Sequence, residues 1–127
     1  MSHENFAVLA DLKVFVVEDE SLVLMNLEDM LAELGCRLIG PALRLDQAQG
    51  MLEAAAGADI AVLDVNIGGH VIFPFAEQLK ARGVPLVLAT GYGRDGLPEA
   101  WREVTVLSKP YGFHDLAQAL LTAKGLA

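Results

Sequence analysis

Five short apolar runs alternate along the chain with longer stretches whose apolar residues recur at helical spacing. The runs are rich in β-branched and aliphatic residues and are apolar at consecutive positions, as in KVFVV and IAVL. They occupy residues 13–17, 36–39, 60–63, 84–89 and 104–107. Because consecutive residues of a strand point to opposite faces, these runs predict a parallel sheet that helices cover on both faces.

The stretches between and after the runs predict four helices, at residues 21–34, 44–56, 71–82 and 116–124. Ser21 is a suitable N-cap of the first helix, and Gly35 suits the position just beyond its end. Pro74 is compatible with the third helix only in the first turn, so that helix is expected to start late.

The segment 91–103, between the fourth and fifth runs, holds three glycines and Pro98, which are poor helix formers. The fourth helix of the pattern is therefore expected to be short or absent. Trp101 is expected to hold this segment to the core, with an exposed partner contact as the alternative. The whole pattern predicts a three-layer, doubly wound α/β domain.

Length and composition narrow the class of protein. The chain has 127 residues, which fits one domain, and its hydrophobic fraction of 54% provides enough apolar surface for a packed core. A net charge of −8 argues against nucleic acid and against an anionic membrane surface. Cys36 has no second cysteine to pair with, so it is expected to be a small packing residue. No apolar run is long enough to span a membrane, and residues 1–12 do not resemble a signal peptide, so a cytoplasmic protein is expected.

Polar residues with complementary chemistry follow four of the five runs. Glu18 and Asp19 come after the first run, Asp64 after the third, Thr90 after the fourth and Lys109 after the fifth. Ligands of open parallel sheets bind beyond the carboxyl ends of the strands, so these side chains are expected to converge.

The expected cluster has an excess of negative charge, since its three carboxylates and one lysine sum to −2. Such a cluster favours a divalent cation, and its oxygen ligands suit Mg²⁺ or Mn²⁺ rather than zinc. A cation beside a lysine and a hydroxyl is also what a phosphoryl group needs around its oxygens. One carboxylate would then be the nucleophile, and Asp64 is the candidate because it stands alone after the presumed central strand.

The order of these residues resembles the receiver domain of two-component response regulators, over residues 12–124. The resemblance implies that Asp64 accepts a phosphoryl group from the phosphohistidine of a sensor histidine kinase. It also implies that Thr90 and Lys109, the latter followed by Pro110, contact the phosphoryl oxygens. The ligands that it implies for Mg²⁺ are Glu18, Asp19, Asp64 and the backbone carbonyl of Asn66.

The resemblance further implies the flavodoxin-like strand order 2-1-3-4-5, with residues 1–11 as an N-terminal extension and 12–127 as the receiver domain. Such a protein is mainly a signalling protein, which catalyses its own Mg²⁺-dependent phosphorylation and slow dephosphorylation. It would signal to an unknown downstream protein by contact or by onward phosphotransfer. The segments DVNIGG, GVPLVLATGYG and LSKPY are similar to stand-alone receivers of the FATGUY type, which are associated with HWE-type sensor kinases.

Three features depart from the receiver pattern. Val106 stands where most receivers have an aromatic residue, Gly68 stands where proline is common, and the fourth helix is expected to be short or absent. Tyr92 is a candidate substitute for the missing aromatic residue, with a surface tyrosine of no function as the alternative. The activation signal is therefore expected in the glycine-rich segment 91–103.

The same residues bear on four other functions. A degenerate receiver that binds partners without phosphorylation is disfavoured by the intact Asp64, Thr90 and Lys109. GYGRDG at 91–96 matches a dinucleotide fingerprint, but the stretch after it is too short for the crossover helix. A phosphatase of the haloacid dehalogenase type needs an acid where Asn66 stands. A flavin carrier needs a phosphate-binding loop where the acidic EDES follows the first strand.

Overall fold

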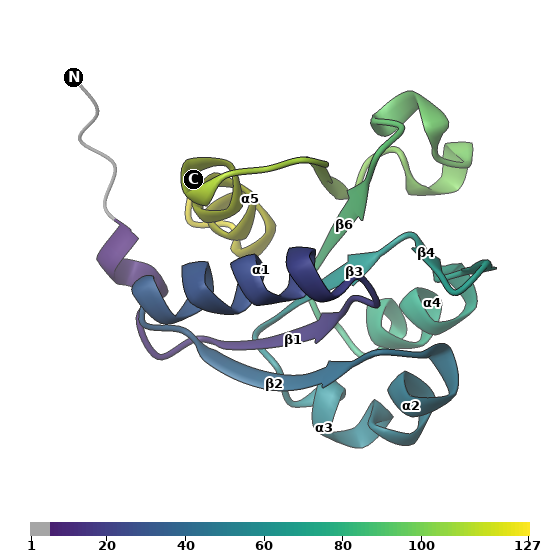
Figure 1. Ribbon diagram of the computed structural model, residues 1–127, viewed down its shortest axis with the longest axis horizontal. Coiled ribbons are helices and arrows are strands. Elements are labelled where there is room, and N and C mark those ends of the chain that lie inside the picture. Colours follow the sequence, from purple (N-terminus) through teal and green to yellow (C-terminus); the bar gives the residue numbers. More distant parts are fainter. Residues whose placement is uncertain (1–5) are drawn as a thin grey trace.

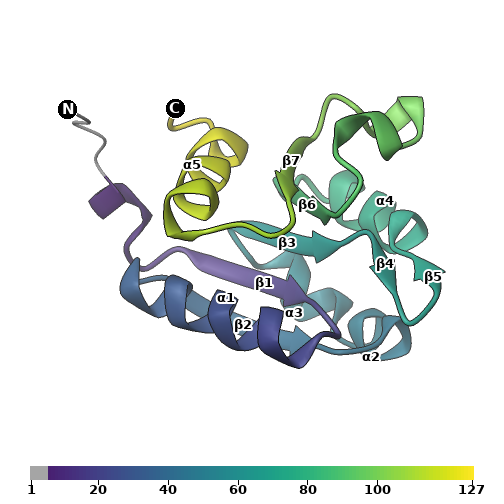
Figure 2. The ribbon, with the colours of Figure 1, turned by 45° about the horizontal axis from the view of Figure 1, so that its top comes forward.

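The computed structural model describes residues 6–127, which form a five-stranded parallel sheet between two layers of helices (Figures 1 and 2). The strands of this sheet are β1 (Lys13–Val17), β2 (Arg37–Ala42), β3 (Ile60–Asp64), β6 (Leu86–Thr90) and β7 (Thr105–Ser108). Their order is β2-β1-β3-β6-β7, which is the predicted order 2-1-3-4-5 of the sheet strands. The predicted doubly wound fold is confirmed.

Residues 6–127 also contain five α-helices and three short 3₁₀ helices, which precede, connect and follow the strands. The α-helices are α1 (Ser21–Glu33), α2 (Leu45–Gly50), α3 (Leu52–Ala56), α4 (Phe73–Ala81) and α5 (Phe113–Lys124). The 3₁₀ helices are η1 (Phe6–Leu9), η2 (Arg94–Gly96) and η3 (Glu99–Trp101). None of the helices within residues 6–127 has both the length and the apolar character needed to cross a membrane.

The hydrophobic core has two halves, one on each face of the sheet. In β1, Val14 and Val16 face α1 and α5, whereas Phe15 and Val17 face α2, α3 and α4. Helix η1 packs on the α1/α5 side, where Leu9 is fully buried. Because strands β1, β3 and β6 are buried along almost their whole length, their sequences are apolar at consecutive positions.

Several element bounds differ from the prediction. The helix expected at 44–56 is two helices, because Met51 has a non-helical ψ of 11° directly after Gly50, a poor helix former. Glu20 rather than Ser21 occupies the N-cap position of the first helix, without a side-chain capping hydrogen bond, and Ser21 is the first helical residue. β2 continues through Pro41, which an edge strand tolerates because its missing N–H can face away from the sheet.

A small hairpin between β3 and α4 was not predicted. Its strands are β4 (Asn66–Ile67) and β5 (His70–Val71), and they pair antiparallel across Gly68 and Gly69. Helix α4 then starts late, with Pro74 in its first turn, as the sequence predicts.

The segment between β6 and β7 contains only η2 and η3, so the predicted absence of a full fourth helix is confirmed. Trp101 is buried and stacks on Phe73 of α4, with ring centroids 5.3 Å apart, while Lys80 Nζ lies 5.2 Å from the centre of the indole. Trp101 therefore holds this segment to the core. The Arg94 guanidinium also donates to the carbonyl oxygens of Arg102 and Val104. In the same segment, Arg102 Nε donates to the carbonyl oxygen of Leu97 at 3.0 Å.

Candidate functional site

The carboxyl edge of the sheet brings together all the residues that the sequence predicts to converge. Asp19, Asp64, Thr90 and Lys109 line one open cavity of about 570 Å³, and Glu18 is buried behind it against Lys109. The residues come from the ends of β1, β3, β6 and β7. They meet because parallel neighbours in one sheet place all their carboxyl ends at one edge.

Lys109 is the centre of the charge network. Its Nζ lies 3.0 Å from Asp64 Oδ2, 3.1 Å from Glu18 Oε1 and 3.8 Å from Glu20 Oε1. Burial alone would lower the pKa of Lys109, but hydrogen bonds and charges from Asp64 and Glu18 outweigh it and raise the pKa to about 12. The ammonium therefore stays charged at any physiological pH.

Glu18 is the most buried of the acidic residues, with 2% of its surface exposed. Burial raises the pKa of Glu18, the backbone N–H of Glu20 opposes that rise, and the Asp64 carboxylate adds to it. The Glu20 N–H donates to Glu18 Oε2 at 3.1 Å, and this bond fixes the Glu18 side chain beneath the cavity.

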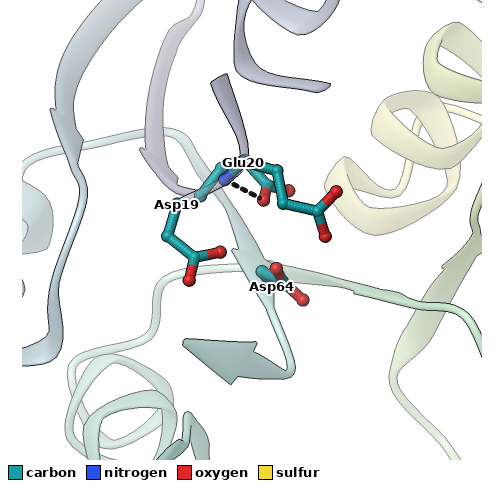
Figure 3. Close-up of side chains that lie close together, drawn as sticks. Asp19, Glu20 and Asp64 are labelled. Carbon is teal, nitrogen blue, oxygen red and sulfur yellow. Dashed lines mark hydrogen bonds between the residues drawn. The ribbon is translucent and has the colours of Figure 1, made fainter. Parts of the chain in front are cut away.

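Four carboxylates could hold a metal ion here. One oxygen each from Glu18, Asp19, Glu20 and Asp64 lies within 4.8 Å of the others. Figure 3 shows Asp19 and Glu20 projecting from the segment after β1, above Asp64 at the end of β3. Lys109 supplies one positive charge against four negative ones, so the donor set fits a hard divalent cation such as Mg²⁺.

Glu20 is a member of this cluster that the sequence reasoning missed. The available signal was the uninterrupted run EDE after the first strand, in which only Glu18 and Asp19 were given a role. Glu20 is also the N-cap residue of α1, and Figure 3 shows its side chain above Asp64 at the end of β3.

Asp64 and Thr90 are both nearly buried, with 6% and 4% of their surfaces exposed. Asp64 Oδ1 accepts a hydrogen bond from the backbone N–H of Asn66 at 3.3 Å, while Oδ2 faces Lys109. Thr90 Oγ1 accepts a hydrogen bond from the backbone N–H of Tyr92 at 3.1 Å. This bond uses the hydroxyl as an acceptor, so its proton is left to donate to an anion in the cavity.

Asp19 is exposed and takes its hydrogen bond from the hairpin. The backbone N–H of Gly68 donates to Asp19 Oδ2 at 3.0 Å. The hairpin therefore forms a wall of the cavity, to which Asn66, Gly69 and Val71 also contribute.

Two further positions bear on the site. Val106 lies in β7 beside Leu88 of β6, and it is partly buried against the core. Tyr92 is 85% exposed at the mouth of the cavity. The position of the missing aromatic residue is therefore filled by a short side chain, and Tyr92 lies in the open rather than in its place.

Comparison with known proteins identifies the family. The chain is 38% identical to SdrG from Sphingomonas melonis Fr1, with a TM-score of 0.78 over 89% of this chain and 96% of that one. It is 36% identical to the BeF3-activated conformation of SdrG, with a TM-score of 0.75 over 93% of this chain and 98% of that one. The PhyR response regulator REC domain of Erythrobacter litoralis has the same fold, at 24% identity and a TM-score of 0.77 over 91% and 92% of the two chains. The chain belongs to the receiver domains of response regulators.

Two more comparisons add detail. The receiver domain of the sensor histidine kinase PA1611 from Pseudomonas aeruginosa, whose structure has magnesium coordinated in the active-site cleft, shares the fold at 20% identity. Its TM-score is 0.71 over 91% of this chain and 99% of that one. The transcriptional regulatory protein PdtaR of Mycobacterium tuberculosis is 28% identical over 112 residues, which cover 85% of this chain. The chain spans about half the length of this curated relative, 54% of it. No protein-family model matches the chain.

Proposed function

We propose that this receiver accepts a phosphoryl group on Asp64 from the phosphohistidine of a sensor histidine kinase. The observation that carries the proposal is the Asp64–Lys109 contact of 3.0 Å at the base of an open acidic cavity. The buried carboxylate of Asp64 lies beside the charged ammonium of Lys109, and the hydroxyl-bearing Thr90 lines the same cavity, which a phosphoryl group would enter.

The transfer needs one bond exchange. A carboxylate oxygen of Asp64 forms a bond to phosphorus as the bond between phosphorus and the imidazole nitrogen breaks, and that nitrogen keeps the electron pair. Lys109 would move its ammonium onto a phosphoryl oxygen, and Thr90 would donate its hydroxyl proton to another. Mg²⁺, when bound, supplies charge neutralisation at the phosphoryl oxygens. Its ligands would be Glu18, Asp19, Asp64 and the carbonyl of Asn66.

Glu20 fits a supporting role in this site. Its carboxylate lies within the same 4.8 Å group and 3.8 Å from Lys109. We propose that it holds Lys109 on the side of the cavity when the ammonium is not engaged by a phosphoryl group.

The proposal also covers the kinase that supplies the phosphoryl group and the way in which the receiver passes on its signal. The 38% identity to SdrG and the segment LATGYG at 88–93 support a stand-alone receiver of the FATGUY type that takes its phosphoryl group from an HWE-type kinase. Such a receiver, extending over residues 12–127 with 1–11 as an extension, would signal by protein contact or by onward phosphotransfer.

Intact mass spectrometry tests the proposal. Incubation with acetyl phosphate and Mg²⁺ should add one phosphoryl group to the wild-type chain and none to the Asp64→Asn variant. Asp29→Asn changes an exposed aspartate of α1 and should leave the adduct intact. An adduct that persists in Asp64→Asn would contradict Asp64 as the acceptor. No adduct from any donor, with partner binding unchanged in Asp64→Asn, would instead favour the degenerate receiver.

A further inference from the structure

The β4–β5 hairpin has a geometry that only a special turn allows. Asn66 pairs with Val71 and Ile67 with His70, so Gly68 and Gly69 form a two-residue connection. Their φ angles are +57° and +84°, which are the left-handed values that a type I′ turn needs at both central positions. Glycine reaches such values without steric cost, and other residues reach them only with strain.

The hairpin is anchored firmly on its inner side. Ile67 is 2% exposed, and Ile72, which follows the hairpin, is fully buried. The backbone N–H of Ile72 donates to the carbonyl oxygen of Val65 at 2.9 Å and closes the base of the hairpin. Its outer residues His70 and Val71 are exposed, so the hairpin contacts the rest of the domain through its base and inner face.

The turn presents one backbone donor to the acidic cluster. In a two-residue hairpin the ladder bonds join the two residues that flank the turn, so the N–H of the first turn residue has no partner within the ladder. Here that group belongs to Gly68, and it donates to Asp19 Oδ2 at 3.0 Å across 49 positions of sequence. This bond joins the hairpin to the segment after β1.

Asp19 depends on this hydrogen-bond donor more than the other carboxylates of the cluster do. The Lys109 ammonium pairs with Glu18, Glu20 and Asp64. Asp19 is exposed and lies among the same like charges, which would push it toward solvent. The Gly68 N–H restrains Asp19 Oδ2, and the other carboxylate oxygen takes no part in this bond.

We infer that Gly68 is a positioning residue, whose backbone N–H holds the Asp19 carboxylate in place to bind a divalent cation. The inference rests on the proposed function, because it takes Asp19 as a ligand. Partners in the outer shell of a metal site orient its ligands, and their loss commonly weakens binding 10- to 100-fold. Asp19 is exposed, so we expect a smaller loss, of about three- to tenfold.

Replacement of the Ile67–Gly68 amide by an ester tests the inference most directly. The ester removes the N–H donor and keeps a glycine-like residue in the turn. We expect the dissociation constant for Mg²⁺, measured from Trp101 fluorescence or calorimetry, to rise about three- to tenfold. In NMR spectra, the amide signal of Gly68 should differ between the wild type and Asp19→Ala, whereas the amide signal of Gly83 should be the same in both.

Side-chain variants provide matched controls. Gly68→Val makes the left-handed turn costly, whereas Gly68→Asn keeps it, because asparagine tolerates such φ values. Gly83 has a φ of +79° and, like Gly68, has open space around its missing Cβ, but it follows α4 away from the cavity. Gly83→Val therefore carries the same backbone strain without a contact to Asp19. Only Gly68→Val should weaken Mg²⁺ binding, while both valine variants should lose similar stability.

The possible results distinguish the role of Gly68 from the proposed Mg²⁺ site on which it rests. If the wild-type chain binds no Mg²⁺, the proposed metal site is wrong. If the wild type binds Mg²⁺ and the ester variant binds it equally well, the metal site stands and the role of Gly68 is wrong. Equal weakening in Gly68→Val and Gly83→Val would also overturn the role of Gly68, because general strain would then account for the loss.

Discussion

The Cys36 thiol shows how the packing of a single residue sets its chemistry. Its Sγ donates a hydrogen bond to the carbonyl oxygen of Leu9 at 3.4 Å and packs against the core half that contains α1 and α5. Burial raises the pKa of Cys36 to about 11 from an ordinary value of 9.0. The neutral thiol is therefore the stable form in the folded protein at neutral pH.

We expect Cys36 to react slowly with iodoacetamide while the protein is folded. At pH 8 the thiolate fraction should be about 100-fold below that of an ordinary thiol, because the pKa is about two units higher. The rate should rise about tenfold per pH unit up to about pH 11. A raised thiol pKa stabilises the fold below pH 9.0, and that contribution is lost as the pH rises toward 11. Mass spectrometry measures the rate at which iodoacetamide alkylates Cys36 in the folded and in the urea-unfolded chain. Equal rates at pH 8 would contradict the prediction.

Tyr111 provides a second prediction at this scale. Its hydroxyl is buried and lacks a hydrogen-bond partner among the described residues, and burial raises its pKa to about 12, with the Glu18 charge adding to the shift. An unpaired buried hydroxyl costs about 1–3 kcal/mol, so Tyr111→Phe should raise the free energy of unfolding by up to about 1 kcal/mol. Tyr92→Phe is the matched control, because Tyr92 is 85% exposed. Urea unfolding of both variants checks the prediction, and destabilisation by Tyr111→Phe alone would refute it.

At the scale of elements, the segment 91–103 connects the carboxyl edge of the sheet, where Thr90 ends β6, with the surface of α4. It begins next to Thr90, and Trp101 near its end stacks on Phe73, the first residue of α4. Any movement of Thr90 toward a phosphoryl group must be absorbed in this segment, because Val106 has no long ring that could swing in response.

Amide exchange with and without beryllofluoride tests this route. We expect changed protection in residues 91–103, because Thr90 exchanges its bond with the Tyr92 N–H for one with the bound anion. Trp101 is the chain's single tryptophan, so its emission reports the same change. Asp64→Asn should abolish both responses. Changes confined to the helices, with 91–103 unaffected, would count against this mechanism.

The sequence predicted the sheet and the residues at its carboxyl edge well, because both depend on a strong local pattern. Runs apolar at consecutive positions mark buried parallel strands, and the topology then brings Asp64, Thr90 and Lys109 together. The hairpin was not predicted, since each of its strands has two residues and no periodicity. Glu20 was missed because its place in the cluster depends on where α1 begins relative to the end of β3, which is a tertiary effect.

At the scale of the whole molecule, the chain carries a net charge of −8, and the acidic cluster concentrates part of that negative charge in one place. Four carboxylates share one lysine within a single cavity. Their mutual repulsion favours any state of the protein that separates them, and a bound cation reverses that preference.

We expect Mg²⁺ to stabilise the entire domain. A ligand that binds only the folded state at ten times its dissociation constant adds about 1.4 kcal/mol to the free energy of unfolding. Asp19→Asn should raise stability in the absence of Mg²⁺, because it removes one of the repelling charges, and it should lose the Mg²⁺ increment. Thermal unfolding with Mg²⁺ or with a chelator measures both effects. A Tm of Asp19→Asn that rises with Mg²⁺ as much as the wild type does would contradict Asp19 as a ligand.

The two arginines that hold the backbone of the segment 91–103 have a consequence for how this chain can evolve. Arg94 and Arg102 bond to backbone carbonyl oxygens, which every type of residue provides. The exposed side chains of Asp95, Glu99 and Glu103 have no part in these bonds. Substitutions at these exposed positions can therefore change the charge of the outer surface of the segment without loss of the hydrogen bonds that hold its backbone.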